Sequence, residues 1–142
     1  MLFTQATLAE HCQHLPGKVA KSIKAYANQV RGAEYCEYRL VARGDIDLDG
    51  MEDIVVIFTV EGACFDDKEN SPGACGNNAF QYMKAYLGKN LKEVRETPVG
   101  NSTVRGFVNA LTIKNGIIYA GTTRYSLKSG SLIEHPKTEH KQ

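Results

Sequence analysis

Residues 44–60 read GDIDLDGMEDIVVIFTV, an acidic turn that runs directly into an apolar stretch. The stretch from Ile54 to Val60 is rich in β-branched and aromatic residues, which is typical of a β-strand. Upstream, residues 34–43 alternate between apolar and polar types, which predicts a second strand. We therefore expect these two strands to pair as a hairpin, with the acidic turn as their connection.

The acidic turn has the residue spacing of a calcium-binding loop. Calcium takes six to eight oxygen ligands, which acidic side chains and backbone carbonyls supply at alternate positions. Gly50 stands where such a loop must turn sharply. Met51 would contribute its backbone carbonyl, so its side-chain type is free. The predicted ligands at positions 1, 3, 5, 7 and 9 are Asp45, Asp47, Asp49, Met51 and Asp53.

The loop differs from an EF-hand and resembles another family. Val56 stands where an EF-hand has its bidentate glutamate, and a strand rather than a helix follows. The pattern Gly-Asp-x-Asp-x-Asp-Gly-x-x-Asp before an apolar strand is similar to the calcium loop of integrin-type FG-GAP repeats, and to single loops in small bacterial periplasmic or secreted proteins. That resemblance implies the same five ligands. A propeller fold needs several such units, and this chain has one.

A plain acidic turn is the alternative interpretation, since Asp-Gly is a common turn dipeptide. Four aspartates and Glu52 within nine residues repel one another unless a cation neutralises them. We therefore favour the metal site, with Ca²⁺ as the cofactor.

Length and composition describe one ordinary domain. The chain has 142 residues, of which 42% are hydrophobic and 23% charged, so it can bury a genuine core. Its net charge of +1 argues against binding nucleic acid through bulk charge. No apolar run approaches the length of a membrane span.

The four cysteines help to predict the cellular compartment of the protein. We expect Cys64 to pair with Cys75 around a short polar loop, and Cys12 to pair with Cys36; four reduced, buried thiols are the alternative. Disulfides and a calcium loop both favour an oxidising compartment. The N-terminal residues lack the basic and apolar regions of a signal peptide. We expect a periplasmic or secreted domain whose signal peptide has been removed, with the cytoplasm as the alternative.

The remaining pattern predicts an α+β fold in which N-terminal helices pack on a mainly antiparallel sheet of about five or six strands. Helices are expected over residues 5–14 and 18–30, with Gly32 as the C-cap of the second. Further strands are expected over 79–87 and 91–97, and over 104–113 and 117–125, the last two joined by an Asn115-Gly116 turn. Residues 98–102 are expected to form a loop, and the chain from Lys128 a frayed end or late edge segment.

No catalytic pattern stands out in the sequence. His11 and His14 have a spacing that suits a metal on a helix, but no third ligand lies nearby, and no phosphate-binding or nucleophile motif occurs. We therefore predict no catalytic residues. The favoured hypothesis is a non-enzymatic calcium-binding protein of the cell envelope that binds a protein partner, as inhibitors and immunity proteins do, with calcium as a structural staple. A calcium-dependent hydrolase of the same compartment is the alternative.

Overall fold

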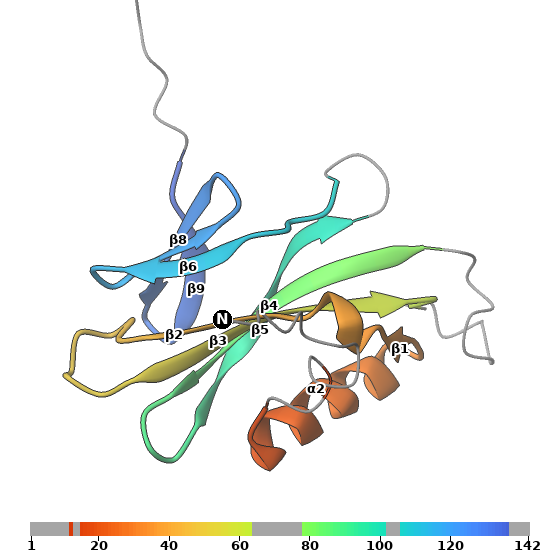
Figure 1. The fold of residues 1–142 in the computed structure, drawn as a ribbon, viewed down its shortest axis with the longest axis horizontal. Helices are drawn as coiled ribbons and strands as arrows, with labels where there is room; N and C mark the ends of the chain where they lie inside the picture. Colours follow the sequence, from red (N-terminus) through yellow and green to blue (C-terminus); the bar gives the residue numbers. More distant parts are fainter. Residues whose placement is uncertain (1–11, 13–14, 64–77, 102–105, 137–142) are drawn as a thin grey trace, which may run out of the picture.

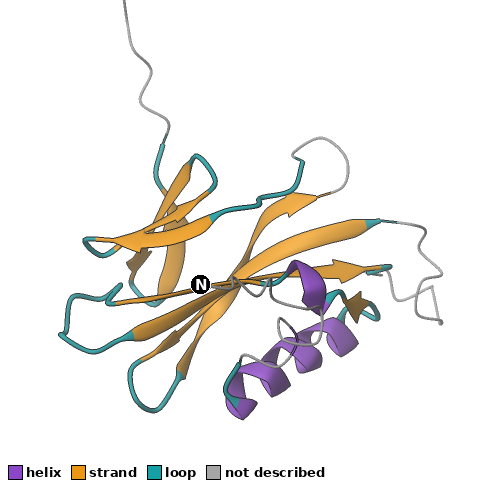
Figure 2. Ribbon diagram, viewed as in Figure 1, coloured by secondary structure: helices purple, strands orange, loops and turns teal. Residues whose placement is uncertain are grey.

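The protein is mostly β-structure, arranged in three layers (Figures 1 and 2). The computed structural model describes residue 12 and residues 15–63, 78–101 and 106–136. These residues form one α-helix and nine strands in two antiparallel sheets. The predicted α+β fold, with N-terminal helices on a single sheet, is therefore wrong. The expected helix over residues 5–14 falls almost entirely outside the described residues.

The first sheet is built around β3 (Asp53–Glu61), the apolar stretch of the sequence. One edge of β3 pairs with β1 (Ala33–Glu34) and with β2 (Leu40–Gly44), which are separated by the short 3-10 helix η1 (Cys36–Tyr38). The other edge pairs with β4 (Ala79–Leu87), which in turn pairs with β5 (Lys92–Asn101). The predicted hairpin across the acidic turn is thus confirmed, as is the pairing of the 79–87 strand with the segment that follows it.

The helix α2 (Gly17–Gln29) covers one face of this sheet, as Figure 1 shows. Its buried positions Val19, Ile23 and Ala27 recur at helical spacing and pack on alternate residues of β3. Across this contact the buried Tyr86 hydroxyl donates a hydrogen bond to the Ser22 hydroxyl, at 2.9 Å. The predicted amphipathic helix over residues 18–30 is confirmed to within a residue at each end.

The helix ends differently from the prediction, which placed Gly32 at the C-cap. Val30 is the C-cap and Arg31 takes the left-handed conformation, with φ 59°. The Gly32 N–H donates to the Ala27 carbonyl at 2.9 Å and the Arg31 N–H to the Asn28 carbonyl at 3.1 Å, which is a Schellman motif. Glycine is needed at 32 for space, because a Cβ would lie 2.5 Å from Val60 Cγ1 and 2.7 Å from the Glu61 carbonyl.

The second sheet is a four-stranded meander on the opposite face of the first. Its strands are β6 (Leu111–Lys114), β7 (Ile117–Ala120), β8 (Thr123–Lys128) and β9 (Ser131–Glu134). Ile118, Tyr125 and Leu132 face the first sheet and meet Val55 and Ile57 of β3 in a shared core. Because the helix lies on the other face, β3 is buried on both sides, and eight of its nine residues are buried.

Three boundary predictions in the C-terminal half are also wrong. The Asn115-Gly116 turn forms as expected, with φ of 53° and 79°, but residues 106–110 before β6 are not a strand. The returning strand breaks at Gly121 into β7 and β8. Residues 98–101, expected as a loop, continue β5, an edge strand where proline is tolerated. The expected late edge segment is β9.

Candidate metal centre and aromatic cleft

The acidic loop, residues 45–52, connects β2 to β3 where the two strands pair Gly44 with Asp53. Its backbone turns through positive φ at Leu48 (59°) and Gly50 (87°). A Cβ at Gly50 would meet nothing within 4 Å, so its conformation rather than crowding favours glycine there. The predicted role of Gly50 as the sharp turn of the loop is confirmed.

Three aspartates gather at this turn. One carboxylate oxygen from each of Asp45, Asp47 and Asp49 lies within 4.8 Å of the other two. Backbone N–H groups hold two of these side chains in place: Gly50 donates to Asp45 Oδ2 at 2.7 Å, and Met51 donates to Asp49 Oδ1 at 2.8 Å. The structure therefore forms a group of oxygen atoms that could hold a metal ion.

The pKa values of Asp47 and Asp45 shift in opposite directions within this cluster. Desolvation, hydrogen bonds with Asp49 and Asp45, and repulsion by Asp53 and Asp49 raise the pKa of Asp47 to about 6. Desolvation opposes ionisation of Asp45 as well, but hydrogen bonds from the backbone N–H groups of Gly50 and Asp49 and from the Asp47 carboxyl outweigh it and lower its pKa. Without a cation, Asp47 thus keeps its proton to a higher pH than an ordinary aspartate does.

Asp53 occupies a different position from the three clustered aspartates. Its side chain is fully buried at the start of β3. Oδ2 accepts the Ile46 N–H and Oδ1 accepts the Gly88 N–H, both at 2.8 Å. Asp53 therefore ties the acidic loop to the turn between β4 and β5. It lies outside the group of three carboxylates, so its predicted role as a fourth carboxylate ligand stays a prediction, as does the role of the Met51 carbonyl.

The acidic loop also rests on the second sheet. Ile46 is buried in the core between the sheets. Leu48 lies against the β6–β7 turn, where a Cβ on Gly116 would lie 3.0 Å from the Leu48 side chain. Gly44 is similarly close to Ile113 of β6. The loop therefore contacts both sheets, and a change in its conformation would alter the packing of one sheet on the other.

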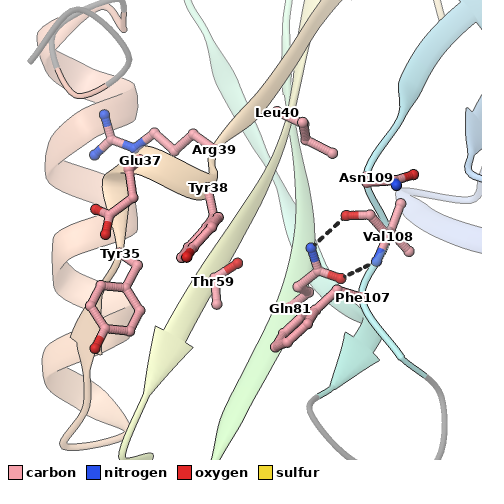
Figure 3. A pocket seen from close by; sticks show the side chains of 10 residues that line it. All are labelled: Tyr35, Glu37, Tyr38, Arg39, Leu40, Thr59, Gln81, Phe107, Val108 and Asn109. Carbon is pink, nitrogen blue, oxygen red and sulfur yellow. Dashed lines mark hydrogen bonds between the residues drawn. The ribbon is translucent and has the colours of Figure 1, made fainter. Parts of the chain in front are cut away.

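A cleft lies between the residues of and around η1 and the segment before β6 (Figure 3). This aromatic cleft has a volume of about 530 Å³. Tyr35 and Tyr38 line one side and Phe107 lines another, while Thr59 and Gln81, partners across β3 and β4, lie between them. Tyr38 is 60% exposed and Phe107 52% exposed, so the rim of the cleft is both aromatic and open to solvent.

The polar side chains of Gln81 and Thr59, both inside the cleft, differ in whether the described part of the chain gives them hydrogen-bond partners. The Gln81 amide is satisfied, because its Nε2 donates to the Val108 carbonyl at 2.8 Å and its Oε1 accepts the Val108 N–H at 2.5 Å. Thr59 is 2% exposed, and its hydroxyl has no hydrogen-bond partner among the described residues. Sequence reasoning missed this cleft, since its lining comes from four segments that are separated in the chain.

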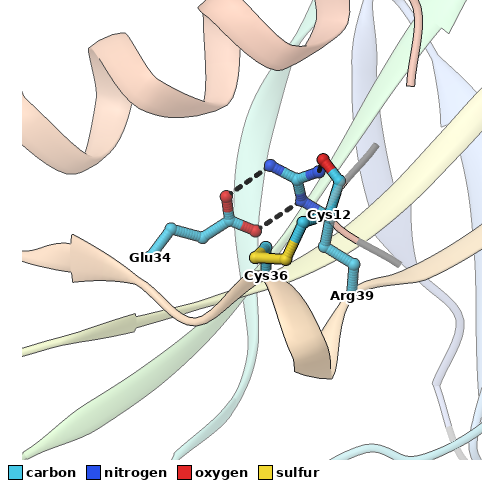
Figure 4. The surroundings of a disulfide bond; sticks show 4 residues. All are labelled: Cys12, Glu34, Cys36 and Arg39. Atoms are coloured by element: carbon cyan, nitrogen blue, oxygen red, sulfur yellow. Dashed lines mark hydrogen bonds and ion pairs between the residues drawn. A yellow bond between two sulfur atoms is a disulfide. The ribbon is translucent and has the colours of Figure 1, made fainter. Parts of the chain in front are cut away.

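The disulfide between Cys12 and Cys36 lies near Arg39, a residue that also lines the cleft (Figure 4). The two Cα atoms are 4.9 Å apart, and the predicted pairing is confirmed. Arg39 fixes this region, because its guanidinium binds both carboxylate oxygens of Glu34, at 2.7 and 2.6 Å, and the Cys12 carbonyl at 2.9 Å. The predicted Cys64–Cys75 pair lies outside the described residues.

The histidines form no site among the described residues. His11, His14 and His140 fall outside them. His135 is hydrogen-bonded to Ser126 on the second sheet, far along the chain from the acidic loop. None of the described helices is long and apolar enough to cross a membrane.

Comparisons with protein-family models, curated proteins and solved structures found no match to this chain. The resemblance to an FG-GAP calcium loop therefore has its support in the loop residues and in the aspartate cluster they form.

Proposed function

We propose that this protein is a non-enzymatic binding protein of the periplasm or extracellular space, and that a calcium ion in the acidic loop staples its two sheets together. The observation that carries the proposal is the convergence of Asp45, Asp47 and Asp49, whose oxygens lie within 4.8 Å of one another on a loop that contacts both sheets.

Calcium is the cation that this loop suits best. The clustered ligands are carboxylate oxygens, which hard cations prefer to the softer transition metals. The turn at Gly50 could add the Met51 carbonyl and water toward the six to eight ligands of calcium. Asp53 could join them only through lone pairs that do not already accept the Ile46 and Gly88 N–H groups. Magnesium demands a near-ideal octahedron and gives up water reluctantly, so we expect it to bind more weakly.

A structural role for calcium is favoured over a catalytic one. The residues that line the aromatic cleft include none from the acidic loop, so an ion in the loop would not face that cavity. Asp53, the residue that continues the loop into β3, is committed to two backbone N–H groups. Both observations support an ion that fixes the β2–β3 connection against the second sheet.

Binding of a protein partner and the oxidising compartment have separate support. Leu48 is 72% exposed at the tip of the acidic loop, and Met51 is exposed beside it. Apolar side chains at a loop tip suit a protein contact, and calcium would order that tip. The Cys12–Cys36 disulfide supports a periplasmic or secreted location.

Thermal unfolding of the non-reduced protein tests the calcium site. Calcium should raise the melting temperature above that in chelator, and Asp49→Ala should abolish the increase. Glu52→Ala is the matched control, because it removes an exposed carboxylate from the same loop that is not in a ligand position. An equal calcium effect in the parent and in Asp49→Ala would contradict the assignment.

The partner contact is tested by affinity capture from the extracellular fraction of the source organism in calcium buffer. We expect one protein to be retained in stoichiometric amount by the parent, to be lost with Leu48→Asn, and to be kept with Ile133→Asn, a matched change at an exposed residue on β9. Equal retention by Leu48→Asn and the parent would contradict a contact at the loop tip.

A further inference from the structure

We propose that the aromatic cleft binds a small uncharged molecule that has a planar ring and one hydrogen-bonding group. This inference goes beyond the proposed function, because it concerns a different surface and does not require calcium. It rests on the shape of the cleft, on its aromatic lining and on the Thr59 hydroxyl, which has no hydrogen-bond partner among the described residues.

The dimensions and lining of the cleft suit a small ligand. Its volume of about 530 Å³ lies within the range of small-molecule pockets, which are mostly apolar and carry a few polar groups that orient the ligand. Phe107 lies on the other side of the cleft from Tyr35 and Tyr38. Aromatic side chains in such a position offer their flat faces and edges to a planar ring.

The Thr59 hydroxyl is the group in the cleft that would hydrogen-bond to the ligand. Buried hydroxyls are nearly always hydrogen-bonded, because burying one without a partner destabilises the fold. Thr59 is buried at the floor of the cleft, and its Oγ1 has no partner among the described residues. Gln81, its neighbour across the strands, is already occupied by Val108. The hydroxyl is therefore the polar group that a ligand in the cleft could pair with, once the side chains that now cover it move aside.

The charges of the cleft favour a neutral ligand over an anion. Among the described residues that line the cleft, Arg39 is the one cation. Its Nε and one terminal nitrogen bind Glu34, and its other terminal nitrogen donates to the Cys12 carbonyl. Glu37 adds a negative charge to the lining. A carboxylate or phosphate ligand would thus find no available cation there, whereas a phenol or an indole needs none.

The probe for this inference is 2-naphthol, a planar uncharged molecule with one hydroxyl, titrated into the full chain and followed by backbone amide NMR. We expect saturable shifts at Thr59, Gln81 and Phe107. Thr59→Val keeps the side-chain shape and removes the hydroxyl, so it should weaken binding about 5-fold, as one hydrogen bond is lost. The anion 2-naphthoate should bind at least about 10-fold more weakly than 2-naphthol, because the cleft offers it no cation.

Phe107→Ala should also weaken binding of 2-naphthol, while Ile133→Ala, which removes an exposed apolar side chain outside the cleft, should not. Amide spectra and melting temperatures establish that each variant is folded. The inference is overturned if 2-naphthol produces no saturable shifts, if the shifts lie away from the cleft, or if Thr59→Val binds as tightly as the parent. Because the titration gives the same prediction in calcium and in chelator, its failure is distinguishable from a failure of the calcium site.

Discussion

Replacing Asp53 with alanine separates an anchoring role from a metal-binding role. In the structure this buried carboxylate accepts two backbone N–H groups, from Ile46 and from Gly88. Alanine would leave the buried Ile46 N–H without a partner, whereas water can reach the partly buried Gly88 N–H. An orphaned buried donor costs about 1–3 kcal/mol and a replaced hydrogen bond about 1 kcal/mol. We expect Asp53→Ala to lower the free energy of unfolding by about 2–4 kcal/mol in metal-free buffer.

Urea unfolding in metal-free buffer and in excess calcium measures this loss. Asp49→Ala is the comparison, because Asp49 is exposed and its predicted role is to bind the ion. Asp49→Ala should cost little without metal and more with calcium, whereas Asp53→Ala should cost several kcal/mol in both conditions. If calcium enlarges the loss in Asp53→Ala as well, Asp53 is also a ligand. A loss below about 1 kcal/mol in metal-free buffer would refute the anchoring role.

Three further predictions concern single residues. Thr59→Val should raise the melting temperature, because it removes a buried hydroxyl that has no partner in the described part of the chain; a lower melting temperature would refute that assignment. Gly32→Ala should lower the melting temperature because a Cβ there collides with β3, whereas Gly17→Ala, in open space, should not; equal effects would contradict the packing argument. In metal-free buffer, Asp47 should stabilise the fold while protonated and lose that contribution as the pH rises from about 4 to 6, since its folded pKa lies above its unfolded value. The difference in melting temperature between the parent and Asp47→Asn should therefore change over that window in metal-free buffer. Calcium should enlarge the difference in favour of the parent, because the variant lacks one carboxylate of the predicted ligand set.

The first half of the described fold follows closely from local sequence signals. The amphipathic spacing of Val19, Ile23 and Ala27 predicts the helix, and the acidic turn between two strand-like segments predicts the β2–β3 hairpin. What the sequence reasoning missed is the second sheet. The apolar run of β3 does not alternate, and a strand without alternation is typical of one buried on both faces. That signal was present and indicates a layer on each side of the first sheet.

The C-terminal strands differ from the prediction for identifiable reasons. Ser129 and Gly130 both have positive φ and form the β8–β9 turn, and the Ser-Gly pair, a recognised turn signal, favours an edge strand there over a frayed end. Pro98 suggested a loop, but it lies on an edge strand where the missing N–H costs nothing. Breaks such as the one at Gly121 depend on how two short strands pack, which local patterns do not encode.

The two candidate sites also differ in how far the sequence alone predicts them. The aspartate cluster is contiguous in sequence, so its spacing predicts it. The aromatic cleft joins η1, β2, β3, β4 and the segment before β6, and only the topology brings these together. Likewise, the burial of Asp53 follows from the position of the β4–β5 turn, which no pattern within the acidic loop indicates.

The central claim is that the acidic loop binds calcium and thereby stabilises the fold. Its most direct test is thermal unfolding of the non-reduced parent protein with excess calcium and with chelator. The account predicts a higher melting temperature with calcium, because an ion that binds only the native state adds about 2.7 kcal/mol of stability when present at 100 times its dissociation constant. An identical melting temperature in the two buffers, for a protein folded in both, would contradict it.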